Sequence, residues 1–329
     1  MPAAHSATTD AVRLLPEGTR LGAVSLAVTD RERTLRFWTG VLGLVEVGGD
    51  SRNGADRDGV DAGAVAHGGG DPIYLGSVAS GGRPLVVLHP GAAAPVVARR
   101  TGLYHVALHI PTRKELARVI ARLFTLRYSN SPTDHLVSET TYLDDLDGNG
   151  IELTLETPDR GDFLPEPIGQ MMARTKDGEL RSGRDPVDLD SLFAELDQGD
   201  DLSAPLVTDR VHHVHLHVGD IERDGAFYRD LIGFPQQLYV PGFQMIDFSL
   251  SADTVVHTLA LNAWSGPGAK PAPPGTAGLR YFTLEVPDQA TVDAMAGRLA
   301  TSGWPFERVT GGLRVADPSA NVLVVRVIE

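Results

Sequence analysis

AVSLAVTDRERTLRFWTGVLGL, which begins at Ala23, and HVHLHVGDIERDGAFYRDLIGF, which begins at His213, are two copies of one pattern. Each copy alternates in polarity, reaches an Asp, continues with the apolar spacing of a helix, and stops at a Gly. The alternation predicts a strand, and Asp30 and Asp220 suit the N-cap of the helix that follows. We therefore interpret the two stretches as one strand–helix unit repeated after 190 residues.

A second pair of copies lies between and after them. HVALHIPTRKELARVIARL begins at His105, and YFTLEVPDQATVDAMAGRL begins 176 residues later, at Tyr281. Both copies then reach a turn and a closing strand, DDLDGNGIEL from Asp144 and ADPSANVLVV from Ala316. The chain thus contains four similar modules, which begin near residues 21, 103, 211 and 279. A single module leaves a sheet edge and an apolar face uncovered, so the modules are expected to pair.

We predict an α+β fold of four βαβββ modules paired into two curved-sheet domains, module two with module three and module one with module four. The polar, Gly- and Pro-rich inserts are expected to be loops. The region between the two halves contains one short helix candidate, DPVDLDSLFAELD. The predicted divisions are a leader (1–19), module one (20–100), module two (101–157), a linker (158–205), module three (206–265) and module four (266–329).

Composition restricts the kind of partner and chemistry. The formal net charge of −14 argues against a nucleic-acid or anionic-membrane surface and favours small-molecule partners. The absence of cysteine excludes disulfides, thiolate nucleophiles and iron–sulfur clusters. No apolar run is long enough to cross a bilayer and no secretory signal is evident, so we expect a cytoplasmic protein. Whether the chain forms a homo-oligomer stays open.

The internal copies serve as a control for function. Three polar residues of modules two and three are missing from the twin modules. Tyr281 stands in place of His105, Val324 in place of Glu152, and Ala23 in place of His213. The fold therefore does not require them. Two His and one carboxylate form the facial triad of non-heme Fe(II) oxygenases, and this triad can converge only if module two faces module three. We predict an Fe(II) site, although Mn(II) accepts the same ligands.

The structural alternative for each residue is a hydrogen-bonded histidine or an ion-paired carboxylate on a strand. It weakens here because all three residues are missing from the twin modules. His109, His215 and His217 lie on the same strands, where they either line a pocket or serve the structure. No role is assigned to four other histidines: His5, His67, His89 and His212.

Opening strands of the type H-V-x-L-x-V and closing strands of the type D-x-D-G-N-x-I-E resemble those of the vicinal oxygen chelate superfamily, which includes glyoxalase I, bleomycin-resistance proteins and extradiol dioxygenases. TGLYHVALHIPTR, DHLVSETTYLDDLDGNGIEL and HHVHLHVGDIERDGAFYRDLIGF most resemble the four-module, catechol 2,3-dioxygenase-like branch. The resemblance spans about residues 20–329. It implies an extradiol ring-cleaving dioxygenase that acts on a small aromatic substrate and O2.

The resemblance also implies further active-site residues. VHTLALN matches a strand whose His is an acid–base catalyst, which nominates His257. Tyr142 stands ten residues before Glu152, as a catalytic Tyr does in that branch, and His135 is a looser match to a nearby catalytic His. The order of the modules differs from the best-known extradiol enzymes, because the Glu-bearing module comes first. A hydroquinone-type substrate therefore stays open.

Two other functions remain open. A glyoxalase-like lyase or isomerase usually takes a fourth protein ligand from the partner module, where the closing strand TVVHTLALN offers His257 but no carboxylate. A non-catalytic small-molecule-binding protein would not need the complete triad. Trp264 is interpreted as a loop anchor in preference to a ring that stacks on substrate.

Overall fold

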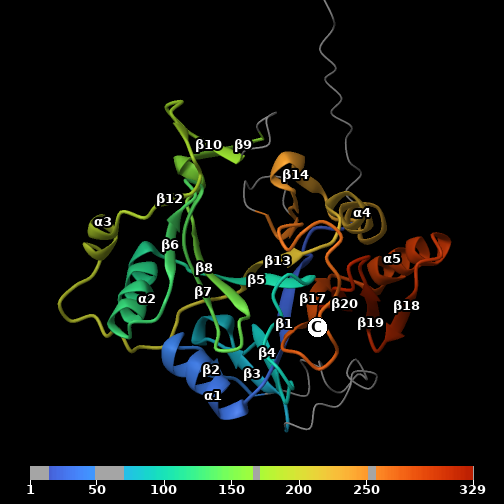
Figure 1. The fold of residues 1–329 in the computed structure, drawn as a ribbon, viewed down its shortest axis with the longest axis horizontal. Coiled ribbons are helices and arrows are strands. Elements are labelled where there is room, and N and C mark those ends of the chain that lie inside the picture. Colours follow the sequence, from blue (N-terminus) through green and yellow to red (C-terminus); the bar gives the residue numbers. More distant parts are fainter. Residues whose placement is uncertain (1–14, 49–69, 166–170, 251–256, 329) are drawn as a thin grey trace, which may run out of the picture.

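The computed structural model describes residues 15–48, 70–165, 171–250 and 257–328. Histidines 5 and 67, and nearly all of the predicted leader, lie outside these ranges. The described chain forms two large sheets and a small three-stranded one, with helices on the outer sides (Figure 1).

Modules one and four form an eight-stranded sheet in the order β18-β19-β20-β17-β1-β4-β3-β2. Its centre is the antiparallel pair of β1 and β17, the opening strands of the two modules. Its helices are α1 (Arg31–Leu35), continued by η1 (Arg36–Val41), and α5 (Gln289–Thr301). Its strands are β1 (Arg20–Val28), β2 (Val45–Glu46), β3 (Ile73–Gly76), β4 (Val86–Pro90), β17 (Gly278–Val286), β18 (Phe306–Val309), β19 (Gly312–Ala316) and β20 (Val322–Val327).

Modules two and three form a nine-stranded sheet in the order β12-β6-β7-β8-β5-β13-β16-β15-β14. Its centre is again an antiparallel pair of opening strands, β5 and β13. Its helices are α2 (Arg113–Thr125) and α4 (Ile221–Ala226), the latter continued by η4 (Phe227–Ile232). Its strands are β5 (Gly102–His109), β6 (Ser131–Asp134), β7 (Ser138–Asp144), β8 (Gly150–Glu156), β12 (Asp185–Pro186), β13 (Val211–His217), β14 (Gln236–Val240), β15 (Met245–Phe248) and β16 (Leu259–Asn262). The predicted fold class and module pairing are confirmed.

The local signals behave as the repeat predicts. Asp30 and Asp220 cap their helices by accepting backbone N–H bonds from the first turn, and Gly233 ends η4 with a φ of 103°. The two closing turns also match. Asn149 donates to Asp145 and Asn321 donates to Asp317, each over 2.9 Å.

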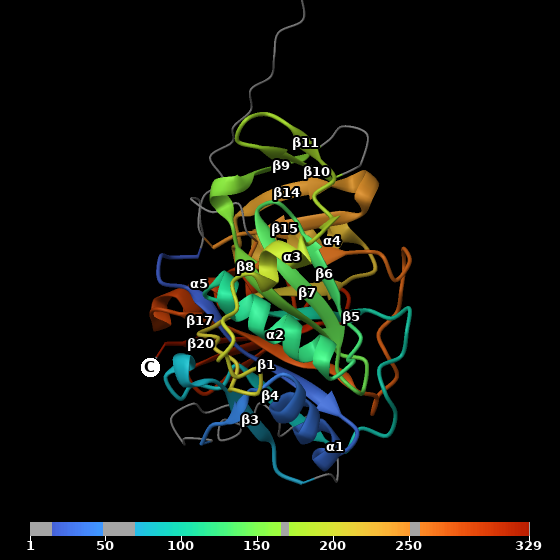
Figure 2. The same cartoon turned by 90° about the vertical axis from the view of Figure 1, so that its left-hand side faces the viewer.

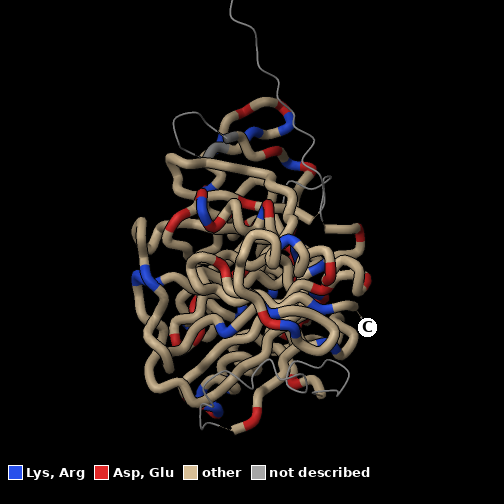
Figure 3. Tube along the Cα trace, turned by 90° about the vertical axis from the view of Figure 1, so that its right-hand side faces the viewer, with Lys and Arg blue, Asp and Glu red and all other residues tan. Residues whose placement is uncertain are grey.

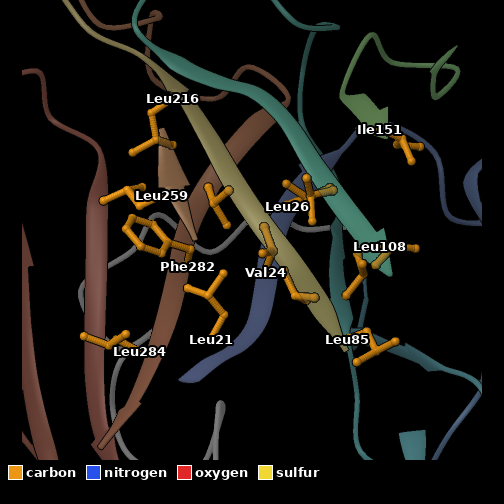
Figure 4. Close-up of a cluster of buried hydrophobic side chains, with 14 of the residues drawn as sticks. Leu21, Val24, Leu26, Leu85, Leu108, Ile151, Leu216, Leu259, Phe282 and Leu284 are labelled. Atoms are coloured by element: carbon orange, nitrogen blue, oxygen red, sulfur yellow. The ribbon is translucent and has the colours of Figure 1, made fainter. Parts of the chain in front are cut away.

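A shared hydrophobic core joins the two sheets. β1 contacts β13, and side chains from both sheets meet between them (Figure 4). Leu26, Leu216 and Phe282 are fully buried there, and each such side chain contributes about 1.5–3 kcal/mol of hydrophobic stabilisation. Since side chains alternate along a strand, Leu216 on the core face leaves His213 and His215 on the opposite, concave face.

The region between the halves is more structured than the sequence indicated. Besides the expected short helix α3 (Leu189–Phe193), it forms a three-stranded sheet and adds β12 to the edge of β6. We call residues 161–186 the linker arm. Figure 2 shows it above β14 and β15, and β9 contacts β14. Its short strands lack the alternation that made the modules recognisable. They are β9 (Gly161–Pro165), β10 (Met171–Thr175) and β11 (Leu180–Arg181).

Acidic and basic positions are interspersed over the face seen in Figure 3. Among the described helices, none is long and apolar enough to cross a membrane.

Candidate metal centre

Three neighbouring strands bring the predicted ligands to one place. β5 lies between β8 and β13 in the nine-stranded sheet. Glu152 on β8 is in register with Ala107 on β5, and His105 on β5 is in register with His215 on β13. The closing strand of module two and the opening strands of modules two and three therefore share one concave face.

The three ligand-type side chains converge on a single point. Nε2 of His105 lies 2.9 Å from Nε2 of His213, and both nitrogens lie 3.0 Å from Oε2 of Glu152. All three residues are buried, with exposed fractions of 4% or less. The other carboxylate oxygen of Glu152 accepts a 2.8 Å hydrogen bond from the hydroxyl of Thr140. A group that matches metal-ligand geometry is thus formed by His105, Glu152 and His213, the one such group among the described residues.

The electrostatics of this group suit a cation. Burial acts to raise the pKa of Glu152, but the adjacent His213 and His105 hold it well below its usual value. Burial lowers the pKa of His213, which favours the neutral imidazole. Metals bind neutral imidazole and ionised carboxylate, and a buried carboxylate needs a positive partner. The donor set therefore fits a divalent metal that prefers nitrogen and oxygen ligands, with further coordination positions left for small molecules.

His257 stands beside this centre. Its ring centroid is 4.3 Å from that of His213, and its Nδ1 lies 3.6 Å from Oδ2 of the buried Asp247. Nε2 of His257 is buried and has no hydrogen-bond partner within the described part of the chain. Burial and the neighbouring His213 lower the pKa of His257 well below its ordinary value. A neutral ring thus presents an unsatisfied nitrogen beside the candidate metal position.

His135 and Tyr142 are also in contact. Nε2 of His135 lies 2.8 Å from the hydroxyl of Tyr142, and Nδ1 of His135 lies 2.6 Å from the carbonyl oxygen of Gly183 in the linker arm. Because a carbonyl can only accept, Nδ1 carries the proton and Nε2 accepts from Tyr142. Burial, with a contribution from Glu152, raises the pKa of Tyr142 well above its usual value, so the phenol stays protonated.

Other histidines of these strands divide between the site and the framework. His215 lines the cavity and its Nε2 lies 2.9 Å from the amide nitrogen of Asn262. His217 lies 2.7 Å from the oxygen of the same amide. His109 forms an ion pair with Asp209 at the end of β5, so its role is structural.

His212 received no role from the sequence, yet its Nδ1 lies 2.7 Å from Nδ1 of His213 and its Nε2 lies 2.9 Å from Glu156. It therefore orients a candidate ligand through the ring nitrogen opposite the metal position. His89 belongs to the other sheet, where its Nε2 lies 2.7 Å from the hydroxyl of Ser25.

A cavity of about 500 Å³ opens onto the candidate metal centre. Much of its wall is aromatic, contributed by Tyr104, Phe163, Phe243 and Trp264. Trp264 donates its indole N–H to the carbonyl of Phe243 and also lines the cavity, so it is both an anchor and a wall. Sequence reasoning did not find Asp247, Arg184, Phe163 or Phe243, because the linker arm and module three supply them without a motif.

The equivalent place in modules one and four is apolar. Val324 packs against Tyr281 in a small buried cluster of that sheet. Val324 pairs with Arg314 across β19 and β20, as Glu152 pairs with Tyr142 across β7 and β8. At the matching positions this framework carries Tyr281, Val324 and Ala23 in place of the ligand residues, as the sequence copies indicate.

Comparisons with known proteins cover most of the chain. The family model described as "Glyoxalase/Bleomycin resistance protein/Dioxygenase superfamily" matches residues 20–153 and 210–324. The chain is 31% identical over 315 residues to a protein of Bacillus subtilis (strain 168) named catechol-2,3-dioxygenase, covering 95% of this chain and 98% of that protein.

Solved structures share the fold. A putative dioxygenase from Bacillus subtilis subsp. subtilis str. 168 superposes with a TM-score of 0.57 at 12% identity, covering 94% of this chain and 84% of that one. Glyoxalase I from Zea mays gives a TM-score of 0.52 at 14% identity, covering 93% and 92% of the two chains. At these identities the likeness concerns the fold alone.

Proposed function

The chain belongs to the glyoxalase/bleomycin resistance protein/dioxygenase superfamily, and we propose that it is an extradiol dioxygenase that opens a catechol-type aromatic ring with O2. One observation carries the proposal: the donor atoms of His105, Glu152 and His213 converge beside a neutral His257 whose Nε2 has no partner among the described residues. The similarity to a catechol-2,3-dioxygenase over nearly the full length supports the same class of reaction.

His105, Glu152 and His213 would hold the metal, which we propose to be Fe(II), with Mn(II) as the alternative. Bound there, Fe(II) would supply the redox chemistry that couples the diol to O2. The cavity holds the ring in place and excludes water through its aromatic walls. Holding both reactants in a fixed orientation lowers the entropic part of the barrier.

The surrounding residues handle protons. Nε2 of His257 is available to take a proton from a reacting oxygen and to return it later, which suits general acid–base catalysis. Because Tyr142 donates its proton to Nε2 of His135, its hydroxyl oxygen is left to accept a hydrogen bond from a substrate hydroxyl. The carbonyl of Gly183 fixes the tautomer of His135.

The geometry favours a dioxygenase over a glyoxalase-type isomerase. β16, the closing strand of module three, reads LALN and carries no carboxylate. Asp247 is the module-three carboxylate among the described residues that line the cavity, and it faces His257 instead of completing the ligand group. The described residues therefore do not provide a carboxylate as the fourth protein ligand, which a glyoxalase-type site would need.

Metal content and O2 uptake test the proposal together. We expect protein prepared without air and supplied with Fe(II) to bind about one metal per triad and to consume O2 with catechol. Single variants His105→Ala, Glu152→Ala and His213→Ala should each lose both properties. His109→Ala, on the same strand as His105 but paired with Asp209, is the matched control and should keep them.

Two outcomes would redirect the proposal. Full metal occupancy in one of the three variants would remove that residue from the ligand set. O2 uptake with hydroquinone but not with catechol would keep the metal site and change the substrate class.

A further inference from the structure

The cavity has two ends of different character. At the inner end stand the anionic Glu152 and the neutral histidines. Aromatic walls follow, and Arg184 lies at the outer rim, where its side chain is both exposed and part of the lining. Among the described residues that line this cavity, Arg184 is the single Lys or Arg.

Within the described ranges, Arg184 forms no ion pair. Its guanidinium carbon lies 4.9 Å from the centroid of the Phe243 ring, a cation–π contact that leaves its N–H donors available. An unpaired guanidinium beside an apolar wall is suited to a planar anion such as a carboxylate.

The backbone around Arg184 is attached to the nine-stranded sheet that carries the candidate metal centre. The preceding residue, Gly183, accepts from His135 over 2.6 Å, and the next residue, Asp185, pairs with Asp134 as β12 joins β6. The peptide nitrogen of Arg184 donates to the hydroxyl of Ser182 over 3.0 Å. These contacts fix the position of the cation relative to the candidate acid–base residues, even though the arm belongs to neither module.

Tyr104 lies between the two ends. Its ring contacts those of His105 and Trp264, with centroids 4.8 and 5.3 Å apart. The ring of Trp264 in turn contacts that of Phe243, with centroids 5.0 Å apart, and Arg184 lies over Phe243. A continuous row of aromatic rings therefore runs from His105 to Arg184.

The net negative charge of the protein bears on how an anionic substrate could bind near Arg184. With a net charge of −14, the protein repels a free anion at long range, so an anionic substrate needs a specific counter-charge at the cavity. A neutral catechol would need no such counter-charge.

We propose that the substrate is a catechol carrying a carboxylate on the side of the ring away from the two hydroxyls, and that Arg184 binds this carboxylate. The inference rests on the proposed ring-cleaving function and narrows its substrate class. The inner end would hold the diol, the aromatic walls would hold the ring, and the linker arm would read the substituent.

The test compares a matched pair of ligands, 3,4-dihydroxyphenylacetate and its methyl ester, which share the catechol ring and differ at the outer end by one negative charge and one methyl group. The wild-type enzyme should prefer the acid in kcat/KM, mainly through KM. In Arg184→Gln the ratio of acid to ester should fall by roughly ten- to a hundredfold, the value of one charge-assisted hydrogen-bonded contact. Arg181→Gln, which removes an exposed cation of the same arm that pairs with Glu179, is the control and should keep the wild-type ratio.

Anaerobic calorimetry gives a second readout that does not depend on turnover: the acid should bind the wild type more tightly than the ester, and Arg184→Gln should abolish the difference. An unchanged ratio in Arg184→Gln, or a wild-type preference for the ester, would overturn the inference. Failure of the proposed function would look different, because neither ligand would then support O2 uptake in any variant.

Discussion

Oδ2 of Asp247 lies 3.6 Å from Nδ1 of His257, while Nε2 of the same ring is buried and has no partner among the described residues. Asp247 is almost fully buried on β15, where it also accepts the backbone N–H of Leu238 over 2.9 Å. Burial raises the pKa of Asp247 to about 7. Protonation of Asp247 therefore changes the charge beside His257 near neutral pH.

His257→Gln separates metal binding from proton transfer. The variant should retain Fe(II), because His257 is not one of the three convergent ligands. Its kcat should fall by about 10²–10⁴-fold, the usual contribution of a general acid–base residue. Metal analysis and an oxygen electrode measure the two properties. Normal turnover in this variant would exclude the acid–base role, and loss of the metal would show that His257 is a ligand.

Asp247→Asn tests the contribution of this charge. As the pH falls through about 7, the carboxyl group of Asp247 gains a proton and loses the negative charge beside Nδ1 of His257. Activity of the wild type should therefore decline on the acidic side of pH 7. The Asn variant should be slower by roughly tenfold and should lack that decline. A pH–kcat profile measures both, and an unchanged acidic limb in the variant would assign the limb to another group.

Tyr142→Phe removes the hydroxyl that His135 supports. We expect a decrease in kcat/KM of about ten- to a hundredfold, because a buried hydrogen bond to the substrate is lost while the ring remains. Tyr128→Phe is the control, since its hydroxyl donates to the carbonyl of Asp144 away from the cavity. Equal effects of the two substitutions would point to stability as the cause, which thermal unfolding of both variants would reveal.

Repetition made the fold predictable. The matched stretches from Ala23 and His213 predicted the strands and helices, and the need to cover sheet edges predicted the pairing. The absence of His105, Glu152 and His213 from the twin modules distinguished these candidate ligands from the framework residues. The structure brings these three together, with Tyr142 and His257 beside them.

The other residues of the site could not be predicted from the sequence, because they have no counterpart in the repeated pattern. Arg184 and Phe163 come from the linker arm, whose strands are too short to give a periodic signal. Asp247 occupies a strand whose single carboxylate reads as an ordinary surface residue until the fold buries it. The sequence assigned no role to His212, because its contact with Nδ1 of His213 can be recognised only in the folded structure.

Gly150→Ala tests how closely β8 must approach β5. A Cβ at Gly150 would lie 1.9 Å from the carbonyl oxygen of Tyr104, so the strands would have to separate. We expect a loss of about 1–3 kcal/mol in the free energy of unfolding. Metal affinity should fall as well, because Glu152 and His105 sit on the two strands that move apart.

The control for this substitution is Gly297→Ala, within helix α5, where a Cβ meets nothing within 4 Å. It should raise stability by about 0.5–1 kcal/mol through helix propensity. Urea unfolding and metal titration measure both variants. Wild-type metal affinity in Gly150→Ala would show that the strand spacing tolerates the change.

Glu156 links stability to pH. Its hydrogen bond with His212, aided by Arg210, lowers the pKa of Glu156 from 4.5 to about 2. The unfolded chain therefore binds the proton more readily between these values, so the stabilisation is complete above pH 4.5 and disappears as the pH falls toward 2. With partial solvent screening we expect Glu156→Gln to lower the free energy of unfolding by about 1–2 kcal/mol at pH 7 and by progressively less in acid.

Urea unfolding of the metal-free protein at pH 7 and at lower pH measures this difference. Glu179→Gln, at an exposed ion pair of the linker arm, is the control and should show no such trend. If the loss of stability in Glu156→Gln does not change with pH, then Glu156 stabilises the fold through packing and not through its charge.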